Sequence, residues 1–259
     1  MQSFPLPPQH VDIWKIDLRN AEAVTLADPG LLSPDEADRA ARFRFARDRQ
    51  RFIAGRIAMR RILAGYANVS PREVVFSYGT DGKPELSGAL QQCGLKFNLS
   101  HSRDLGLLAV TKCLNVGIDV EWIDDKFPTQ EIAQQFYSAA EIRRFQELDS
   151  LSRVAGFYEC WTRKEAYIKA LGGGLAVPLD SFEVAFGKGA AAALLQVRSD
   201  PRELMRWSMY GLNVEFGYKA ALVVEGRGHR LRRLSWTPDV EKDSGSEHPR
   251  AVQQAFTLK

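Results

Sequence analysis

The chain has 259 residues, of which 45% are hydrophobic and 26% are charged. This composition supports one large or two small globular units and excludes a chain that is disordered throughout. The 35 basic and 32 acidic side chains leave a net charge of only +3, whereas a nucleic-acid-binding domain is expected to be strongly basic. No cationic stretch followed by an apolar core opens the chain, and no run of about 18 apolar residues follows. We therefore expect a cytoplasmic protein that binds neither nucleic acid nor a membrane.

An alternating apolar pattern over residues 11–18 predicts the first strand. Ser33, with Glu36 three residues later, matches a capping box, and apolar residues then recur at helical spacing up to Gly65, a plausible helix stop. Short β-rich runs follow at residues 73–78 and 105–111, and the glycines and proline of residues 79–84 predict a turn or loop between them.

The second half of the chain repeats that order. Val116 to Trp122 predicts a strand, and Ser138 with Glu141 forms another capping-box pattern. The helix that follows is expected to stop at the three glycines of residues 172–174. Further strands are expected over residues 181–186, 207–216 and 219–225. Cysteines 93, 113 and 160 are odd in number and far apart, so they fit neither a disulfide framework nor a zinc site and are expected to be buried thiols.

A faint internal similarity aligns Ala58 with Ala166 and Arg56 with Lys164. Two similar α/β halves, each too small to cover its own sheet, would pack together and leave a cleft between them. Beyond Gly226 the composition becomes polar and charged. We expect an N-terminal α/β subdomain over residues 1–114, a C-terminal one over 115–226, and a polar, flexible tail over 227–259.

The predicted strand at residues 116–122 carries two carboxylates, Asp119 and Glu121. Side chains two residues apart on a strand point to the same face, so the two carboxylates would lie together, and the opposite face, with Val116, Ile118 and Val120, would be buried. Oxygen ligands of this kind suit Mg²⁺ that is shared with phosphate. Taken alone, the pattern favours a half-exposed strand with two solvated acids, because D-x-E is commonplace on strands.

The predicted helix through residues 157–172 places Trp161, Glu165 and Lys169 four residues apart, and hence on one face. An aromatic wall, a carboxylate and an ammonium would be presented together. A surface ion pair between Glu165 and Lys169 is the simpler alternative, and such a pair contributes only about 0.3–0.5 kcal/mol.

The segment 98–102 combines three small polar side chains with His101, and such groups can bind phosphate oxygens. A hydrogen-bonded structural histidine is the alternative, and no G-x-S-x-G elbow accompanies it. Arginines crowd a neighbouring region with few acids, which favours an anionic partner such as a nucleotide, an acidic protein or RNA, or else marks a solvated helix face. The arginines are Arg39, Arg42, Arg44, Arg47, Arg49, Arg51, Arg56, Arg60 and Arg61.

Four motifs together resemble the signature set of the 4'-phosphopantetheinyl transferases, and their order and spacing are similar to the long, Sfp-type branch. The combination of D-x-E with W-x-x-K-E-x-x-x-K is far more specific than either piece alone. The similarity covers roughly residues 10–225. The motifs are G-I-D-V-E at 117–121, W-T-R-K-E-A-Y-I-K at 161–169, N-L-S-H-S at 98–102 and G-K-P at 82–84.

The resemblance implies two similar subdomains related by a pseudo-twofold, with coenzyme A in the cleft between them. It implies that Mg²⁺, or alternatively Mn²⁺, is held by Asp119, Glu121 and Glu165. Lys169 would contact the reacting phosphate. The residues expected to hold the phosphates and the adenosine part of coenzyme A are Arg39, Lys83, Pro84, Ser100 and His101.

Two positions depart from the family pattern. Some relatives carry a second basic residue where this chain has Glu36, which would weaken a clamp on the 3'-phosphate of coenzyme A. A G-K-G sequence after the helix is replaced here by the glycines at residues 172–174. Neither departure touches the residues expected to bind the metal.

The reaction implied by the resemblance is attack of a carrier-protein serine on the β-phosphate of coenzyme A, with 3',5'-ADP as the leaving group. Glu165 would accept the serine proton, directly or through a water, and Lys169 would stabilise the equatorial oxygens. A second hypothesis is another Mg²⁺-dependent phosphoryl-transfer enzyme, such as a nucleotide phosphatase. A third is a non-catalytic RNA- or protein-binding module, which would show steep salt dependence and no need for Mg²⁺.

The partner is expected to be an apo acyl or peptidyl carrier protein, whose serine stands at the head of an acidic helix. The arginine-rich region could attract such a helix by charge, and the apolar loop around Phe127, Phe136 and Tyr137 could bury part of it. Pseudo-symmetry within one chain makes a monomer the expected state.

Overall fold

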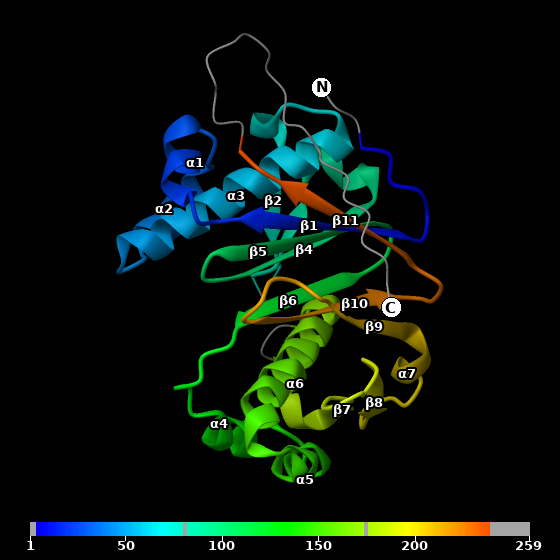
Figure 1. The fold of residues 1–259 in the computed structure, drawn as a ribbon. Helices are drawn as coiled ribbons and strands as arrows, with labels where there is room; N and C mark the ends of the chain where they lie inside the picture. Colours follow the sequence, from blue (N-terminus) through cyan, green and yellow to red (C-terminus); the bar gives the residue numbers. More distant parts are fainter. Residues whose placement is uncertain (1–3, 80–81, 174–175, 239–259) are drawn as a thin grey trace. The chain divides into compact units, whose positions relative to one another are not determined.

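The computed structural model describes residues 4–79, 82–173 and 176–238 (Figure 1). The chain divides into two compact units. The N-terminal unit comprises Met1–Ser77, Glu85–Cys113 and Arg230–Lys259, and the C-terminal unit comprises Tyr78–Pro84 and Leu114–His229. Both units combine helices with a β-sheet, which confirms the expected α/β class.

The N-terminal unit is built on a four-stranded sheet in the order β11-β1-β5-β4. β1 pairs with β5 in antiparallel fashion, and β5 pairs with β4 in the same way. The central strand β5 is buried along almost its whole length, so both faces of the sheet are covered there. The strands span His10–Asp17 (β1), Leu95–Ser102 (β4), Leu105–Lys112 (β5) and Arg230–Trp236 (β11).

The helix expected after Ser33 is interrupted. Its capping box is present, with the Ser33 amide donating to Glu36 at 2.9 Å, but the first helix ends at Ala41 and a new one begins at Ala46. The second helix passes through Gly65 and ends at Ala67, and the next residue, Asn68, adopts the left-handed conformation (φ 55°) that asparagine tolerates. The helices are α1 (Ala21–Ala27), α2 (Pro34–Ala41) and α3 (Ala46–Ala67); the short elements are η1 (Pro71–Glu73), β2 (Phe76–Tyr78), β3 (Pro84–Leu86) and η2 (Gly88–Cys93).

Glu36 is a buried structural residue, with 1% of its surface exposed. Its two carboxylate oxygens accept from Arg56 at 2.5 Å and from Arg60 at 2.7 Å, both on α3. Burial alone would raise the pKa of Glu36, but Arg56, the Ser33 amide and Arg60 lower it below the usual value. The buried carboxylate therefore joins α2 to α3.

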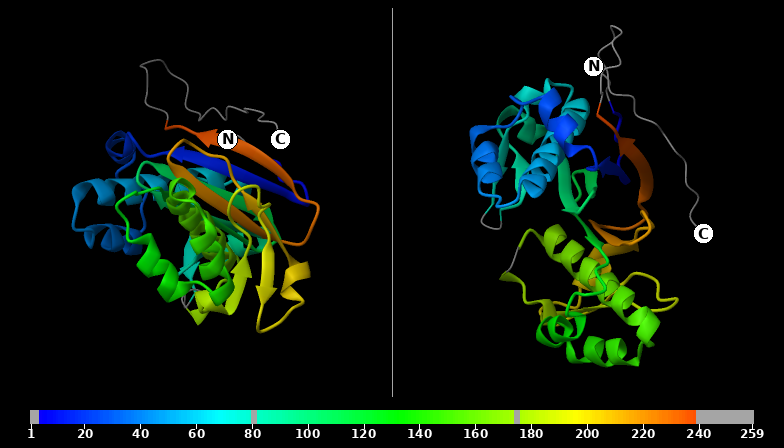
Figure 2. Two further views of the ribbon diagram at one scale, coloured as in Figure 1. Left: turned by 60° about the horizontal axis from the view of Figure 1, so that its bottom comes forward. Right: turned by 60° about the vertical axis from the view of Figure 1, so that its left-hand side comes forward.

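The prediction of a flexible tail from residue 227 onward is wrong for residues 230–236. They form β11, which runs parallel to β1 with Arg232 opposite Asp12 (Figure 2). Arg232 donates to both oxygens of the buried Asp12, at 2.7 and 2.6 Å. The last strand thus belongs to the N-terminal unit, because its charged residues have partners on β1 that composition alone does not reveal. Residues 239–259 of the expected tail lie outside the described residues.

The C-terminal unit is built on a three-stranded antiparallel sheet, β6-β10-β9, against which α6 packs. The strands are β6 (Val116–Trp122), β9 (Trp207–Gly211) and β10 (Tyr218–Glu225), with a separate hairpin of β7 (Phe182–Val184) and β8 (Leu194–Val197). The helices are α4 (Thr129–Phe136), α5 (Ala139–Glu147), α6 (Ser150–Leu171) and α7 (Glu203–Arg206), with the 3₁₀ turn η4 at Leu179–Ser181.

Two helices stand where one was expected after Ser138. The capping box of Ser138 and Glu141 starts α5, as expected, with the Ser138 amide donating to Glu141 at 2.9 Å. Asp149 then caps a new helix by accepting from the amides of Leu151 and Ser152. α6 ends at Leu171, just before the left-handed Gly172 (φ 69°), where the sequence predicts the stop. Gly174 lies outside the described residues.

Two expectations drawn from composition have different outcomes. Cys160 is buried as expected, but Cys93 is only half-buried and Cys113 is exposed at a turn with positive φ (61°), so the expectation of buried thiols is wrong for Cys113. Within the described ranges, no helix is both long and apolar enough to cross a membrane.

Glu36→Gln is expected to destabilise the chain by about 3–5 kcal/mol, because it removes one partner of a buried ion pair. The folded-state pKa of Glu36 is lowered. Its stabilising effect is therefore complete above the ordinary glutamate pKa of about 4.3 and is lost as the pH falls through the folded pKa. Urea unfolding at several pH values measures this, with the exposed Asp38→Asn on the same helix as the control. Equal, small losses in both variants would contradict the buried role.

Candidate active site

β6 brings two carboxylates to one side of the C-terminal sheet. Asp119 stands opposite Ala221 on β10, and Glu121 stands opposite Lys219. The apolar residues Val116, Ile118 and Val120 of β6 are fully buried, as expected, but Asp119 is also buried, with 2% exposure. Because both faces of β6 are covered at Asp119, a half-exposed strand with two solvated acids no longer describes this segment.

α6 presents one accessible stripe toward that side. Within residues 161–170, only Trp161, Glu165 and Lys169 are partly exposed, and every other side chain is buried. The spacing of four residues places the three on one face of the helix, as the sequence predicts. α6 therefore contributes an aromatic ring, a carboxylate and an ammonium from a helix that is otherwise inside the core.

Gly117 permits the close contact between β6 and α6. A Cβ atom at Gly117 would lie 2.1 Å from the carbonyl oxygen of Ala166 and 2.4 Å from the amide nitrogen of Ala170, so no other residue fits. The consequence is direct contact between the functional side chains: Lys169 Nζ donates to Asp119 Oδ1 at 2.5 Å. The sequence contained a signal for this role, because an isolated glycine in a strand often marks close backbone approach.

The side chains shift one another's protonation equilibria. Burial raises the pKa of Glu165, the carboxylate of Asp119 raises it further, and Lys169 opposes both. Burial would lower the pKa of Lys169, but the ion pair and hydrogen bond with Asp119, together with Glu165 and Glu121, raise it overall. Glu165 is therefore more easily protonated than an ordinary glutamate, and Lys169 stays positively charged.

The donor chemistry of this group fits a hard divalent cation. Asp119, Glu121 and Glu165 offer only carboxylate oxygens, which Mg²⁺ prefers. Among the described residues, however, no group of three or more His, Cys, Asp or Glu side chains is arranged so that it could hold a metal ion. Lys169 instead supplies the positive charge next to Asp119. The three-carboxylate metal set thus stays a prediction.

Lys83 contacts the protein backbone. Its ammonium donates to the carbonyl oxygen of Val116 at 3.0 Å and to that of Lys169 at 2.5 Å. These two carbonyls belong to β6 and to the last turn of α6. Pro84, expected beside it on coenzyme A, begins β3 and is half-buried.

Three further expected coenzyme A contacts belong to the N-terminal unit. Arg39 is exposed in the last turn of α2, with its guanidinium 5.6 Å from the centre of the Phe52 ring. Ser100 and His101 follow one another on β4, so their side chains point to opposite faces. Ser100 is buried and His101 is exposed. Their joint action on one ligand stays a prediction.

The arginine-rich region is partly structural. Arg51, Arg56 and Arg60 are buried. Arg51 pairs with Asp104, and Arg61 pairs with Asp28 at 2.9 Å. Neither an anionic partner nor a solvated helix face therefore explains these four arginines. The exposed members are Arg39, Arg42, Arg44, Arg47 and Arg49.

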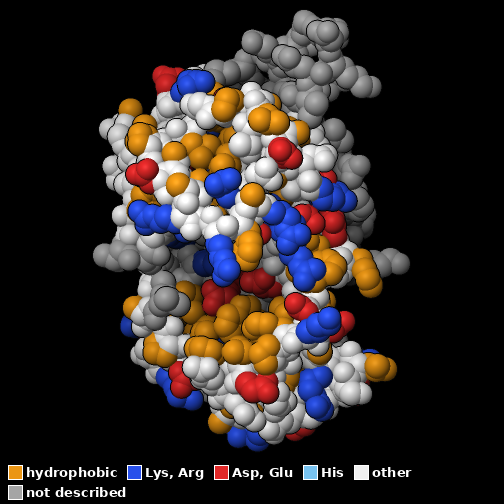
Figure 3. Space-filling model, turned by 90° about the vertical axis from the view of Figure 1, so that its left-hand side faces the viewer, with side chains coloured by type: hydrophobic (Ala, Val, Ile, Leu, Met, Phe, Trp, Pro, Cys, Tyr) orange, Lys and Arg blue, Asp and Glu red, His pale blue; other side chains and the backbone are white. Residues whose placement is uncertain are grey.

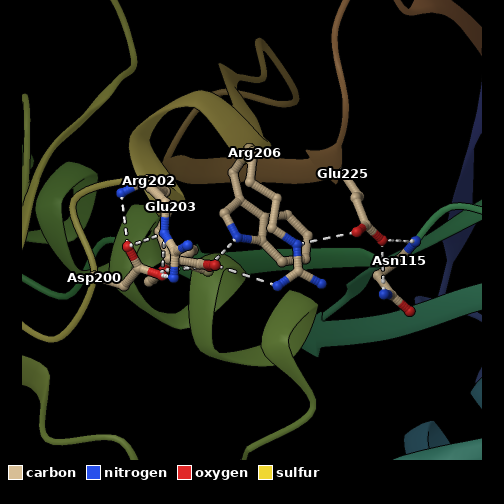
Figure 4. Close-up of polar contacts among 8 residues, drawn as sticks. Asn115, Asp200, Arg202, Glu203, Arg206 and Glu225 are labelled. Atoms are coloured by element: carbon tan, nitrogen blue, oxygen red, sulfur yellow. Dashed lines mark hydrogen bonds and ion pairs between the residues drawn. The ribbon is translucent and has the colours of Figure 1, made fainter.

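A hydrogen-bonded cluster fixes the buried side of α6 (Figure 4). The Tyr167 hydroxyl donates to Glu203 on α7 at 3.3 Å, and the indole of Trp207 donates to the same carboxylate oxygen at 2.5 Å. Arg206 then joins Glu203, at 3.2 Å, to Glu225 on β10, at 3.0 Å. Since Tyr167 lies between Glu165 and Lys169 in the sequence, the cluster holds the helix that carries both of them.

Lys164, next to Glu165, is fully buried and pairs with the equally buried Glu141 of α5 at 2.7 Å. Its ammonium also donates to the carbonyl oxygens of Leu179 and Phe182, at 2.7 Å each. Glu141 in turn accepts from the Val184 amide at 2.8 Å. This pair connects α5, α6 and the β7 hairpin, and the sequence patterns identified each partner without predicting their contact.

Apolar side chains gather on one face of the C-terminal unit, in the lower half of Figure 3. Phe127 is 42% exposed, and Phe136 packs edge-on against Trp161 with 6.0 Å between ring centres. Tyr137 is only 3% exposed and stacks on Phe157, so the expectation that it contacts a partner is wrong. Its ring fills the core beneath the apolar surface.

Both units match models of one family. Residues 115–223 match the model described as the 4'-phosphopantetheinyl transferase superfamily, and residues 22–113 match the one described as 4'-phosphopantetheinyl transferase, N-terminal. Among solved structures, the holo-[acyl-carrier-protein] synthase of Thermotoga maritima has 23% identity and a TM-score of 0.35, over 49% of this chain and 70% of that one.

Curated relatives carry the same description. The 4'-phosphopantetheinyl transferase HetI of Nostoc sp. is 36% identical over 87% of this chain and 94% of its own length. The 4'-phosphopantetheinyl transferase psf-1 of Bacillus pumilus is 30% identical over 71% of this chain and 76% of its own length. The human L-aminoadipate-semialdehyde dehydrogenase-phosphopantetheinyl transferase is 30% identical over 59% of this chain and 52% of its own length.

Lys164→Met is expected to lower the free energy of unfolding by about 3–5 kcal/mol, because it leaves the Glu141 carboxylate buried without its counter-charge. Chemical denaturation measures the loss. Lys188→Met, at an exposed position of the same unit, is the control and should change stability by less than about 0.5 kcal/mol. A Lys164→Met protein as stable as the control would refute the structural role of this pair.

Proposed function

The chain belongs to the 4'-phosphopantetheinyl transferase family, and on that premise we propose that it transfers the 4'-phosphopantetheine arm of coenzyme A to a serine of an apo acyl or peptidyl carrier protein. The family resemblance read from the motifs is thereby confirmed. The observation that carries the proposal is the contact between Lys169 of α6 and Asp119 of β6, which lies inside the residues matched by the superfamily model.

In the proposed reaction, the serine oxygen forms a bond to the β-phosphorus of coenzyme A, and the bond from that phosphorus to 3',5'-ADP breaks. Glu165 accepts the serine proton. Its raised pKa brings its basicity closer to that needed near neutral pH. Lys169, whose positive charge is stabilised by its acidic neighbours, binds an oxygen of the reacting phosphate.

Asp119, Glu121 and Glu165 would hold Mg²⁺ in this site. When bound, the ion would supply positive charge that neutralises the diphosphate. The buried Asp119 carboxylate and the half-buried Glu121 and Glu165 support this assignment, because carboxylate oxygens are the ligands that Mg²⁺ prefers.

The N-terminal unit would contribute binding groups for coenzyme A. Arg39 and His101 are exposed and can reach a ligand, whereas the Ser100 side chain is buried and points to the opposite face of β4. The arginines that stay exposed on α2, on α3 and between them would attract an acidic carrier helix. Phe127 and Phe136 would bury part of that helix. A monomer in the cytoplasm stays the expected state of the protein.

The direct test is the intact mass of an apo carrier protein after incubation with this protein, coenzyme A and Mg²⁺. We expect a mass gain of one phosphopantetheine arm, which EDTA abolishes. Release of phosphate or nucleotide with no modified carrier, for carriers from several pathways, would instead indicate a phosphatase and overturn the proposal.

Asp119→Ala should leave the chain folded and reduce transfer by at least about 10²-fold, because the reaction depends on positioning and charge neutralisation. Initial rates of carrier modification measure this, with circular dichroism as the folding check. Glu147→Gln, an exposed carboxylate at the end of α5, is the matched control and should keep the wild-type rate. Full activity of Asp119→Ala would remove Asp119 from the site.

A further inference from the structure

Lys83 occupies a position where a strand and a helix meet. Its ammonium donates to the carbonyl oxygen of Val116, the first residue of β6, and to that of Lys169, in the last turn of α6. One side chain thus joins the backbones of the two elements that carry the acidic and basic groups of the site.

The Lys169 carbonyl lies in the last turn of α6. The last four carbonyls of a helix have no partner within the helix. α6 ends at Leu171, and the amide of Gly172 returns to the carbonyl of Ile168, one residue before Lys169. The Lys83 ammonium satisfies the next carbonyl and places a positive charge at the negative end of the helix, where charge of that sign is favourable.

The backbones of β6 and α6 also approach each other closely at the residue after Val116. Gly117 follows Val116, and its missing side chain leaves room for the backbone of Ala166 to Ala170. Gly117 allows the approach, and Lys83 attaches the helix end to the strand beside it. Two residues later on β6, Asp119 accepts from the side chain of the same Lys169 whose carbonyl Lys83 binds.

We propose that Lys83 is a positioning residue that holds the last turn of α6 against β6, so that Lys169 and Glu165 stay aligned with Asp119. This inference rests on the proposed transferase function. It differs from the role carried over from the family motif, in which Lys83 would hold coenzyme A. A coenzyme A ligand and a positioning residue affect different kinetic constants, so the two roles can be separated.

The test compares Lys83→Met with wild type in carrier modification. Methionine matches the apolar stem of lysine but has no ammonium and cannot bridge the two carbonyls. We expect kcat to fall about 10- to 100-fold, since a displacement of about 1 Å at a catalytic group has effects of this size. The KM for coenzyme A should stay within about twofold. Lys96→Met, at a partly exposed lysine that pairs with Glu85, is the control and should change neither constant.

Hydrogen exchange gives a readout that does not need activity. In Lys83→Met, the amides of residues 166–171 should exchange faster than in wild type, while those at the start of α6 should not change. If Lys83→Met does not fold, Lys83→Gln provides the same measurements, because its amide can still reach one carbonyl without a charge.

Each outcome decides the proposal. A raised KM for coenzyme A with unchanged kcat and unchanged exchange would assign Lys83 to coenzyme A and overturn the positioning role. Wild-type kinetics and exchange in the variant would also overturn it. If wild-type protein modifies no carrier, the transferase proposal fails, and faster exchange at residues 166–171 alone would still establish that Lys83 holds the end of α6.

Discussion

The close crossing of α6 over β6 at Gly117 is the constraint on which the candidate site depends. A side chain at that position would collide with the backbone of Ala166 and Ala170, so the helix can approach only because glycine is there. The approach brings the Lys169 ammonium within 2.5 Å of Asp119. It also leaves Glu165 partly buried beside the acidic strand, which raises its pKa and suits it to accept a proton.

Each unit holds its long helix by the same kind of buried ion pair. In each, the glutamate of a capping box on a short helix pairs with a buried basic residue of the long helix that follows: Glu36 with Arg56, and Glu141 with Lys164. Arg56 and Lys164 are also the basic residues that the faint internal similarity aligns, and α3 and α6 each have 22 residues. The occurrence of this ion pair in both units supports a duplication. In the C-terminal unit the pair fixes Lys164, the residue next to Glu165.

The parts of the site that follow local periodicity were predictable from the sequence. β6 has the expected bounds, and Trp161, Glu165 and Lys169 share one helix face, because spacings of two and four residues determine which side chains lie together. Contacts between distant segments were not predictable. The partners of Lys83 depend on how β6 meets α6, and the pairing of β11 with β1 depends on Asp12 and Arg232, which are far apart in the chain. The break before α6 had a local signal in Asp149, a favourable capping residue.

A crystal structure with Mn²⁺ and coenzyme A tests the central claim most directly, because anomalous scattering locates the ion without reference to activity. The account predicts one strong peak bound by oxygens of Asp119, Glu121 and Glu165 and by the diphosphate of coenzyme A. A peak bound by other side chains, or coenzyme A bound with no ion near Asp119 while Lys169 keeps its ion pair, would contradict the account.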